Sequence, residues 1–276
     1  MNIFGQKCLA LRRLGHTLTE ISKITGRPKS SVYGYIQNIP LDTKKLKSIK
    51  QASGIRARKL AQDRKGKSNR IFKKFNAWNK DTINIVSHFL FDGEIKKEGC
   101  IYNNRNTSLV HGVEKSMKKI YDFKPKYYFN SKTGVSRVSY FNVVLGAYMK
   151  NKSEELLREI LNLPVNLKRI FLRAFFDDEG CMDYRPKRNL RRIRGYQKNN
   201  KILHLIQKLL KSFDIESSII PPNEVVVSGK KNLQKFQEKI NFSSGVKING
   251  KRPNSIWKKS LEKRGLLDQA IRSFKT

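Results

Sequence analysis

Acidic residues and long apolar runs are both scarce in this chain of 276 residues. It has 22 Asp and Glu against 59 Lys and Arg, which leaves a formal net charge of +37. Such an excess of positive charge is hard to keep compact without a polyanion, and nucleic acid is the usual polyanionic partner. No run of about 18 apolar residues occurs, so we expect no membrane span. Because 38% of the residues are hydrophobic, we expect folded cores instead of a purely architectural basic protein.

Cysteine is also rare. Cys8, Cys100 and Cys181 are widely spaced and form no CxxC pair, and the four histidines lack zinc-site spacing. We therefore expect no disulfide framework and no structural zinc. The N-terminus has no uninterrupted apolar stretch of the signal-peptide kind. Together these features predict an intracellular protein, in the cytoplasm or nucleoid.

The first 42 residues predict a helix-turn-helix. Short helices are expected over residues 7–14, 18–25 and 29–39, with a capping box at Thr17–Glu20 and a stop at Gly26. The front of the third helix would then contact DNA through Lys29, Ser30, Ser31 and Tyr33. A small helical cap without DNA contacts is the alternative.

Residues 43–80 predict a basic linker. Thirteen Lys or Arg and a single acid, Asp63, lie between Lys44 and Lys74. We expect a basic helix or a partly disordered segment that contacts phosphates without reading bases, or one that is merely solvated.

A buried helix is predicted from Leu167 to Gly180, where LKRIFLRAFFDDEG is apolar on nearly every side. Asp177, Asp178 and Glu179 stand in its last turn. The C-terminal end of a helix carries partial negative charge, so each acid there costs about 0.3–1 kcal/mol. We expect a metal ion to compensate these charges, and we expect Gly180 to cap the helix in the left-handed conformation.

The same pattern occurs earlier, where INIVSHFLFDGE follows the helix-start signal Asp81-Thr82 and ends with Asp92-Gly93. Each of these helices is followed by a strand, a helix opened by Asn106 or by Asn199-Asn200, and further extended segments. Both copies therefore predict the order helix, two strands, helix, two strands, helix. The expected fold class is α+β, with tandem αββαββα repeats related by a pseudo-twofold axis and preceded by the small all-α domain.

The second copy has an additional basic segment, YRPKRNLRRIRGYQK, which predicts a β-hairpin. Its cations could contact DNA or could simply be solvated. They are Arg185, Lys187, Arg188, Arg191, Arg192, Arg194 and Lys198.

FLRAFFDDEG closely resembles the signature of LAGLIDADG homing endonucleases, and IVSHFLFDG resembles their more variable first copy. The resemblance implies that the two signature helices pack side by side, with Ser87 and Ala174 permitting the close approach. It also implies that Asp92 and Glu179, each just before the terminal glycine, hold Mg²⁺ or another divalent cation such as Mn²⁺ over the scissile phosphates. Asp177 and Asp178 are secondary, and the first copy has Leu90 at the position of Asp177.

Further roles follow only from the same resemblance. INFSSGVKINGK is similar to a segment that carries a basic residue near the cleavage centre, which implies that Lys247 stabilises developing charge on the phosphate. Asn103 and Gln197 would order water or contact bases near the centre, or they are ordinary strand residues. The implied activity is that of a monomeric, site-specific double-strand DNA endonuclease of the homing kind, associated with introns.

Two alternatives stay open. One is a non-catalytic DNA-binding regulator on the same fold, against which the presence of both Asp92 and Glu179 argues. The other is a maturase with intron RNA as its partner. An intein is not expected, because the chain shows no splice-junction His-Asn and no initial Cys or Ser. The predicted domains are residues 1–42, the linker 43–80, repeats 81–164 and 165–265, and a tail 266–276.

Overall fold

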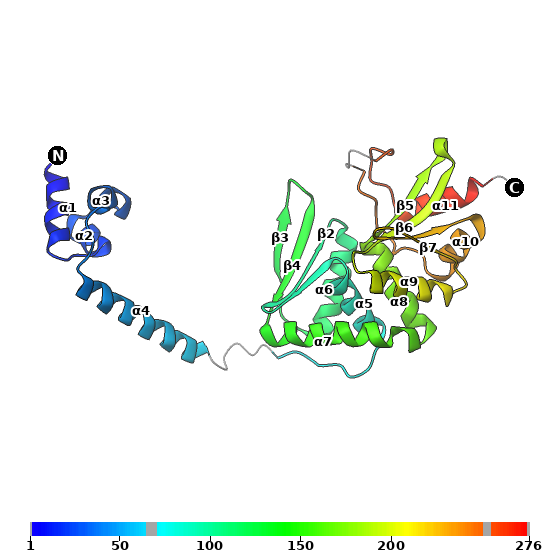
Figure 1. Ribbon diagram of the computed structural model, residues 1–276, viewed down its shortest axis with the longest axis horizontal. Helices are drawn as coiled ribbons and strands as arrows, with labels where there is room; N and C mark the ends of the chain where they lie inside the picture. The colour runs from blue at the N-terminus through cyan, green and yellow to red at the C-terminus, as the bar shows by residue number, and fades with distance from the viewer. Residues whose placement is uncertain (1, 65–70, 251–254, 275–276) are drawn as a thin grey trace. The chain divides into compact units, whose positions relative to one another are not determined.

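The computed structural model of this protein describes residues 2–64, 71–250 and 255–274, and the chain divides into two compact units, Met1–Asn69 and Arg70–Thr276 (Figure 1). Within these described ranges, no helix combines the length and apolar character needed to cross a membrane.

Three short helices form the first unit around a small core, as the sequence predicted. The capping box of Thr17 and Glu20 is present, and Gly26 ends the second helix in the left-handed region with φ 67°. The core consists of Cys8, Ile21, Val32 and Ile36. The helices are α1 (Ile3–Arg13), α2 (Leu18–Thr25) and α3 (Lys29–Ile36).

Two boundaries of this unit differ from the prediction. The first helix starts earlier than Lys7, because the Asn2 side chain accepts a hydrogen bond from the Gly5 backbone N–H and caps it at Ile3. The third helix ends at Ile36 and not at Ile39. All four predicted DNA-contact residues at its front, Lys29, Ser30, Ser31 and Tyr33, are exposed.

The predicted linker is divided between the two units. Its first part is a basic helix, α4 (Thr43–Arg64). Its last part is anchored on the second unit, where the Tyr148 hydroxyl accepts a hydrogen bond from the Phe75 N–H and donates one to the Phe75 carbonyl. The side chains of Phe72, Phe75 and Trp78 pack against the main core.

The second unit contains the predicted tandem repeat. Each repeat has one antiparallel four-stranded sheet, with the order β1-β2-β4-β3 in the first and β5-β6-β8-β7 in the second. The first repeat consists of α5 (Lys80–Leu90), β1 (Gly93–Lys96), β2 (Gly99–Asn104), α6 (Thr107–Ile120), β3 (Lys126–Asn130), β4 (Val135–Phe141) and α7 (Val143–Glu159). The second consists of α8 (Val165–Asp178), β5 (Gly180–Arg185), β6 (Leu190–Tyr196), α9 (Asn200–Lys211), β7 (Ser218–Ile220), β8 (Glu224–Ser228) and α10 (Lys230–Lys239).

Short 3₁₀ turns occur at Ile160–Asn162 and at Pro186–Arg188, and the last helix is α11 (Lys263–Arg272). This helix crosses the boundary predicted at residue 265. Leu266, Leu267 and Ala270 are buried in the main core, so residues 266–271 belong to the fold and do not form a free tail.

Helices α5 and α8 pack against each other at the centre of the unit. The Phe91 ring that follows α5 contacts two rings of α8, with centroids 5.3 Å from Phe171 and 5.1 Å from Phe175. Ser87 and Ala174 are both buried. The nearly continuous apolar surface of each helix is therefore explained by its contacts with the other helix and with the sheets.

Gly180 is not a left-handed cap, and that prediction is wrong. It is absent from the residues with positive φ; Glu179 caps α8, and β5 begins directly at Gly180. A Cβ at Gly180 would lie 2.5 Å from the Phe176 carbonyl oxygen, and a Cβ at Gly93 would lie 2.4 Å from the Phe89 Cα. Glycine is needed at both positions because the strand turns back against the last helical turn.

We expect Gly180→Ala to lower the free energy of unfolding by about 1–3 kcal/mol, because the new methyl group overlaps backbone. Gly112→Ala is the matched control, since Gly112 is inside α6 and no heavy atom lies within 4 Å of the added Cβ. This change should stabilise the protein by about 0.5–1 kcal/mol. Urea unfolding of the two variants measures the difference, and equal effects would contradict the close-approach explanation.

Candidate functional site

Asp92 and Glu179 occupy equivalent positions in the two repeats. Each residue follows the last turn of a central helix and precedes the first residue of a strand, Gly93 or Gly180. Because α5 and α8 pack together, their C-terminal ends bring two acids to the centre of the unit. Both side chains are partly buried.

The two carboxyl groups are held among other negative charges. Burial, followed by the charges of Asp178 and Glu179, raises the pKa of Asp92 to about 8. Burial and the charge of Asp178 raise the pKa of Glu179 to about 7. A cation bound between them would relieve this repulsion, because it favours the ionised form of both groups.

Lys263 supplies part of the compensation that the sequence analysis assigned to a metal. The residue is 4% exposed, and its ammonium group donates hydrogen bonds to the carbonyl oxygens of Phe176 (3.0 Å) and Asp177 (2.7 Å). A cation at the last carbonyls of a helix complements the negative end of its dipole. Burial lowers the pKa of Lys263, whereas the neighbouring acids, Asp177 first, raise it. No local motif marks this residue, since it reaches α8 only through the packing of α11.

Asp178 joins the second repeat to the first. Its carboxylate is fully buried, accepts a hydrogen bond from the Tyr102 hydroxyl (2.7 Å), and lies 2.8 Å from the His88 Nδ1. Although burial disfavours a charged imidazole, Asp178 raises the pKa of His88 above its ordinary value. The acid that the sequence analysis ranked as secondary is therefore part of a buried polar network between α8, α5 and β2.

Asn104, which the sequence did not single out, contacts the acid of the first repeat. The Asn104 Nδ2 donates to the Asp92 Oδ2 (2.8 Å) and to the Tyr102 hydroxyl (3.1 Å). Successive side chains of a strand point to opposite faces. Asn103 accordingly lies on the other face of the sheet, where its Oδ1 accepts from Arg137 (2.8 Å) and its Nδ2 donates to Glu94 (3.4 Å).

Lys247 is exposed, and only its backbone is fixed to the first repeat. Its N–H donates to the Asn106 Oδ1 (2.8 Å), and the Asn106 N–H donates to the Asn104 Oδ1 (2.8 Å). Among the described residues, no hydrogen bond or ion pair joins the Lys247 ammonium to Asp92 or Glu179. Because Asn104 also donates to Asp92, Asn106 and Asn104 together link the backbone of Lys247 to Asp92.

Apart from Arg191, the predicted cations of the basic hairpin are either held by acids or exposed. Arg185 and Arg192 donate to Asp183 at 2.8 and 3.1 Å, and Arg194 forms a two-point contact with Glu224. Gln197 accepts a hydrogen bond from the Asn199 N–H (3.1 Å), which holds the entry to α9. The exposed cations of the hairpin are Lys187, Arg188 and Lys198.

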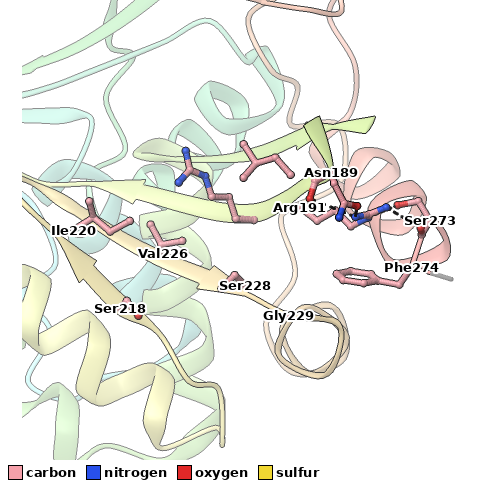
Figure 2. Close-up of a pocket in the computed structure, with 11 residues that line it drawn as sticks. Asn189, Arg191, Ser218, Ile220, Val226, Ser228, Gly229, Ser273 and Phe274 are labelled. Carbon is pink, nitrogen blue, oxygen red and sulfur yellow. Dashed lines mark hydrogen bonds between the residues drawn. The ribbon is translucent and has the colours of Figure 1, made fainter. Parts of the chain in front are cut away.

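Arg191 faces the opposite side of the hairpin. Figure 2 shows it beside Ser273 and Phe274 in a pocket of about 830 Å³. Its Nε donates to the Ser273 Oγ (2.6 Å), and its guanidinium lies 4.7 Å from the centre of the Phe274 ring. The alternation of β6 explains this orientation, and the contacts favour a structural role at the end of α11 over the predicted DNA contact.

The donor set around Asp92 and Glu179 suits a hard cation that keeps several of its waters, because such ions need only one or two protein carboxylates. Among the described residues, no group of three or more His, Cys, Asp or Glu side chains is placed to hold a metal ion. Asp92 and Glu179 could therefore supply only part of the coordination of such an ion, and water and phosphate would complete it.

We expect Lys263→Met to lower the free energy of unfolding by about 3–5 kcal/mol, because it leaves buried negative groups without their cation. Lys231→Met is the control, since Lys231 is exposed on α10 and the same side-chain change should alter stability little. Chemical denaturation measures both, and a small loss for Lys263→Met would show that the ammonium does not balance the end of α8.

Comparison with known proteins agrees with the resemblance expected from the sequence. Residues 166–241 match the family model described as LAGLIDADG-like domain. A search of curated protein sequences gave no match.

Solved structures that are similar to this chain include two of DUF199/WhiA and one of a homing endonuclease. The N-terminal LAGLIDADG domain of DUF199/WhiA has 17% identity and a TM-score of 0.45, covering 62% of this chain and 88% of that one. Full-length DUF199/WhiA from Thermatoga maritima has 15% identity and a TM-score of 0.48, covering 74% and 64%. The homing endonuclease I-WcaI bound to its DNA recognition sequence has 15% identity and a TM-score of 0.47, covering 62% and 86%. The match to the LAGLIDADG-like domain model falls on the second repeat, from residue 166 to residue 241.

Proposed function

We propose that this protein is a metal-dependent, site-specific double-strand DNA endonuclease of the homing kind. The observation that carries the proposal is the pair of acids at the ends of α5 and α8. Burial and neighbouring negative charge raise the pKa of Asp92 to about 8 and that of Glu179 to about 7. Such an arrangement is costly for a fold and useful for binding a divalent cation.

Asp92 and Glu179 would hold Mg²⁺ or Mn²⁺. When bound, a divalent ion would activate water and stabilise charge during displacement at phosphorus. Asn104 orients the Asp92 carboxylate through its 2.8 Å hydrogen bond, and the Tyr102 hydroxyl holds Asn104 in turn. Because each repeat contributes one acid, the two repeats would act on the two strands of one duplex. A single chain therefore suffices, and we propose that it acts as a monomer.

The charge distribution supports a duplex as the substrate. Phosphate contacts supply affinity, and cations on mobile side chains provide them. Lys187, Arg188 and Lys198 are exposed beside the sheet of the second repeat. The exposed front of α3 offers a separate surface for a groove, and the basic helix α4 offers further phosphate contacts.

The test is cleavage of a randomised duplex library in Mg²⁺ by the parent, Asp92→Asn and Glu179→Gln. We expect cuts at a limited set of sequences for the parent. Each variant should still bind the selected duplex but cut it at least about 100-fold more slowly, since loss of a metal ligand removes several kcal/mol of transition-state stabilisation.

Glu98→Gln is the matched control, because Glu98 is an exposed acid at the turn between β1 and β2. It should cut like the parent. Full cutting by both active-site variants would refute the assignment of the acids. Binding without cutting by the parent would favour the non-catalytic DNA-binding regulator.

A further inference from the structure

Strand β3 of the first repeat exposes three consecutive aromatic side chains. Tyr127 is 53% exposed, Tyr128 is 58% exposed and Phe129 is 53% exposed. The strand lies at the edge of its sheet, where it pairs only with β4. Figure 1 shows the β3–β4 hairpin projecting beyond the helices of the repeat. An aromatic run left in water is costly for a fold that does not use it.

The neighbouring side chains leave these rings accessible. In register, Phe129 faces Ser136, Tyr128 faces Arg137 and Tyr127 faces the buried Val138, so only Tyr127 has an apolar partner on β4. Tyr127 is fixed by a hydrogen bond of 2.8 Å between its hydroxyl and the Ser136 Oγ. Within the described residues, none of the three rings stacks on another aromatic ring.

The second repeat has no such surface. Its equivalent edge strand, β7, consists of Ser218, Ile219 and Ile220. The aromatic run is therefore not required by the fold, nor by a contact that both repeats would make symmetrically with a duplex.

The surroundings of the run are basic. Lys124, Lys126 and Lys132 are exposed, and the sequence from Phe123 to Val135 contains no acid. Exposed rings beside mobile cations form the combination that binds single-stranded nucleic acids, in which bases stack on the rings and phosphates contact the cations.

The rings are available on both faces of the strand. Tyr127 and Phe129 lie on one face, because side chains two residues apart in a strand point the same way. The Tyr127 ring leans toward Ser136, the residue opposite Phe129, and all three rings keep about half of their surface exposed. Tyr128 offers a further ring on the opposite face.

We propose that β3 is a binding site for unpaired nucleobases of a single-stranded nucleic acid, RNA or DNA. Bases stack on the exposed rings of Tyr127 and Phe129 on one face and of Tyr128 on the other, and Lys124, Lys126 and Lys132 contact the phosphates. The site lies outside the Asp92–Glu179 centre and does not depend on cleavage.

The test compares a labelled 12-nucleotide oligomer with an abasic oligomer of equal charge, in RNA and in DNA, by fluorescence anisotropy with the full chain. We expect the base-bearing oligomer to bind about tenfold or more tightly than the abasic one, which is the effect of one or two stacked bases. Comparing the RNA and DNA oligomers shows which of the two nucleic acids the protein prefers.

The variants are Tyr127→Leu with Phe129→Leu, and Tyr128→Leu alone. Leucine keeps apolar bulk and removes the flat ring, so the preference for bases should fall in both while abasic binding stays unchanged. Phe141→Leu is the control, because Phe141 is 52% exposed on β4 but lies outside the run. Thermal melting verifies that all variants fold.

Three outcomes would overturn the proposal. The parent could bind both oligomers equally, or the leucine variants could keep the full preference for bases. The third is a dimer of the parent that the leucine variants lose, without any base preference, which would assign β3 to contacts with a second copy. Duplex cleavage by these variants reports separately on the Asp92–Glu179 centre.

Discussion

Repulsion among buried acids at the ends of two packed helices is the constraint on which the rest of the second unit depends. Asp92 and Glu179 end helices whose dipoles are already negative there, and the neighbouring Asp178 side chain is fully buried beside His88. The fold offsets part of this charge with the Lys263 ammonium at the last carbonyls of α8. The remaining imbalance lies at Asp92 and Glu179, where a divalent cation is proposed to bind.

The same constraint explains features that are distant in sequence. Helix α11 must pack into the core, because it delivers Lys263 to α8. Segment 243–250 is tied to the first repeat through Asn106 and Asn104, which orient Asp92. The two repeats are consequently unequal: Phe91 packs against the rings of α8, whereas Asp178, the matching residue of the second repeat, holds a polar network.

Local patterns predicted the elements well, because helix and strand periodicity, caps and the repeat are properties of neighbouring residues. The order of elements in both repeats is confirmed, as is the position of each acid at the end of its helix. Contacts between distant residues were not predictable in this way. They include the buried Lys263, the fixed Arg191 and the contact of Asn104 with Asp92, which depends on the register of β2. The expected left-handed cap at Gly180 is wrong, because the need for glycine there comes from the close approach of the strand to the helix, which only the packed structure shows.

The most direct measurement is thermal unfolding of the parent and Asp92→Asn at pH 8, in EDTA and in Mg²⁺. The pKa of Asp92 is raised from 3.8 to about 8, so its folded form holds a proton more tightly than the unfolded chain, and stability falls as pH rises through this interval. The account predicts that Asp92→Asn melts at a higher temperature than the parent in EDTA, and that Mg²⁺ stabilises the parent but not the variant. A lower melting temperature for Asp92→Asn in EDTA, with an equal response of both proteins to Mg²⁺, would contradict it.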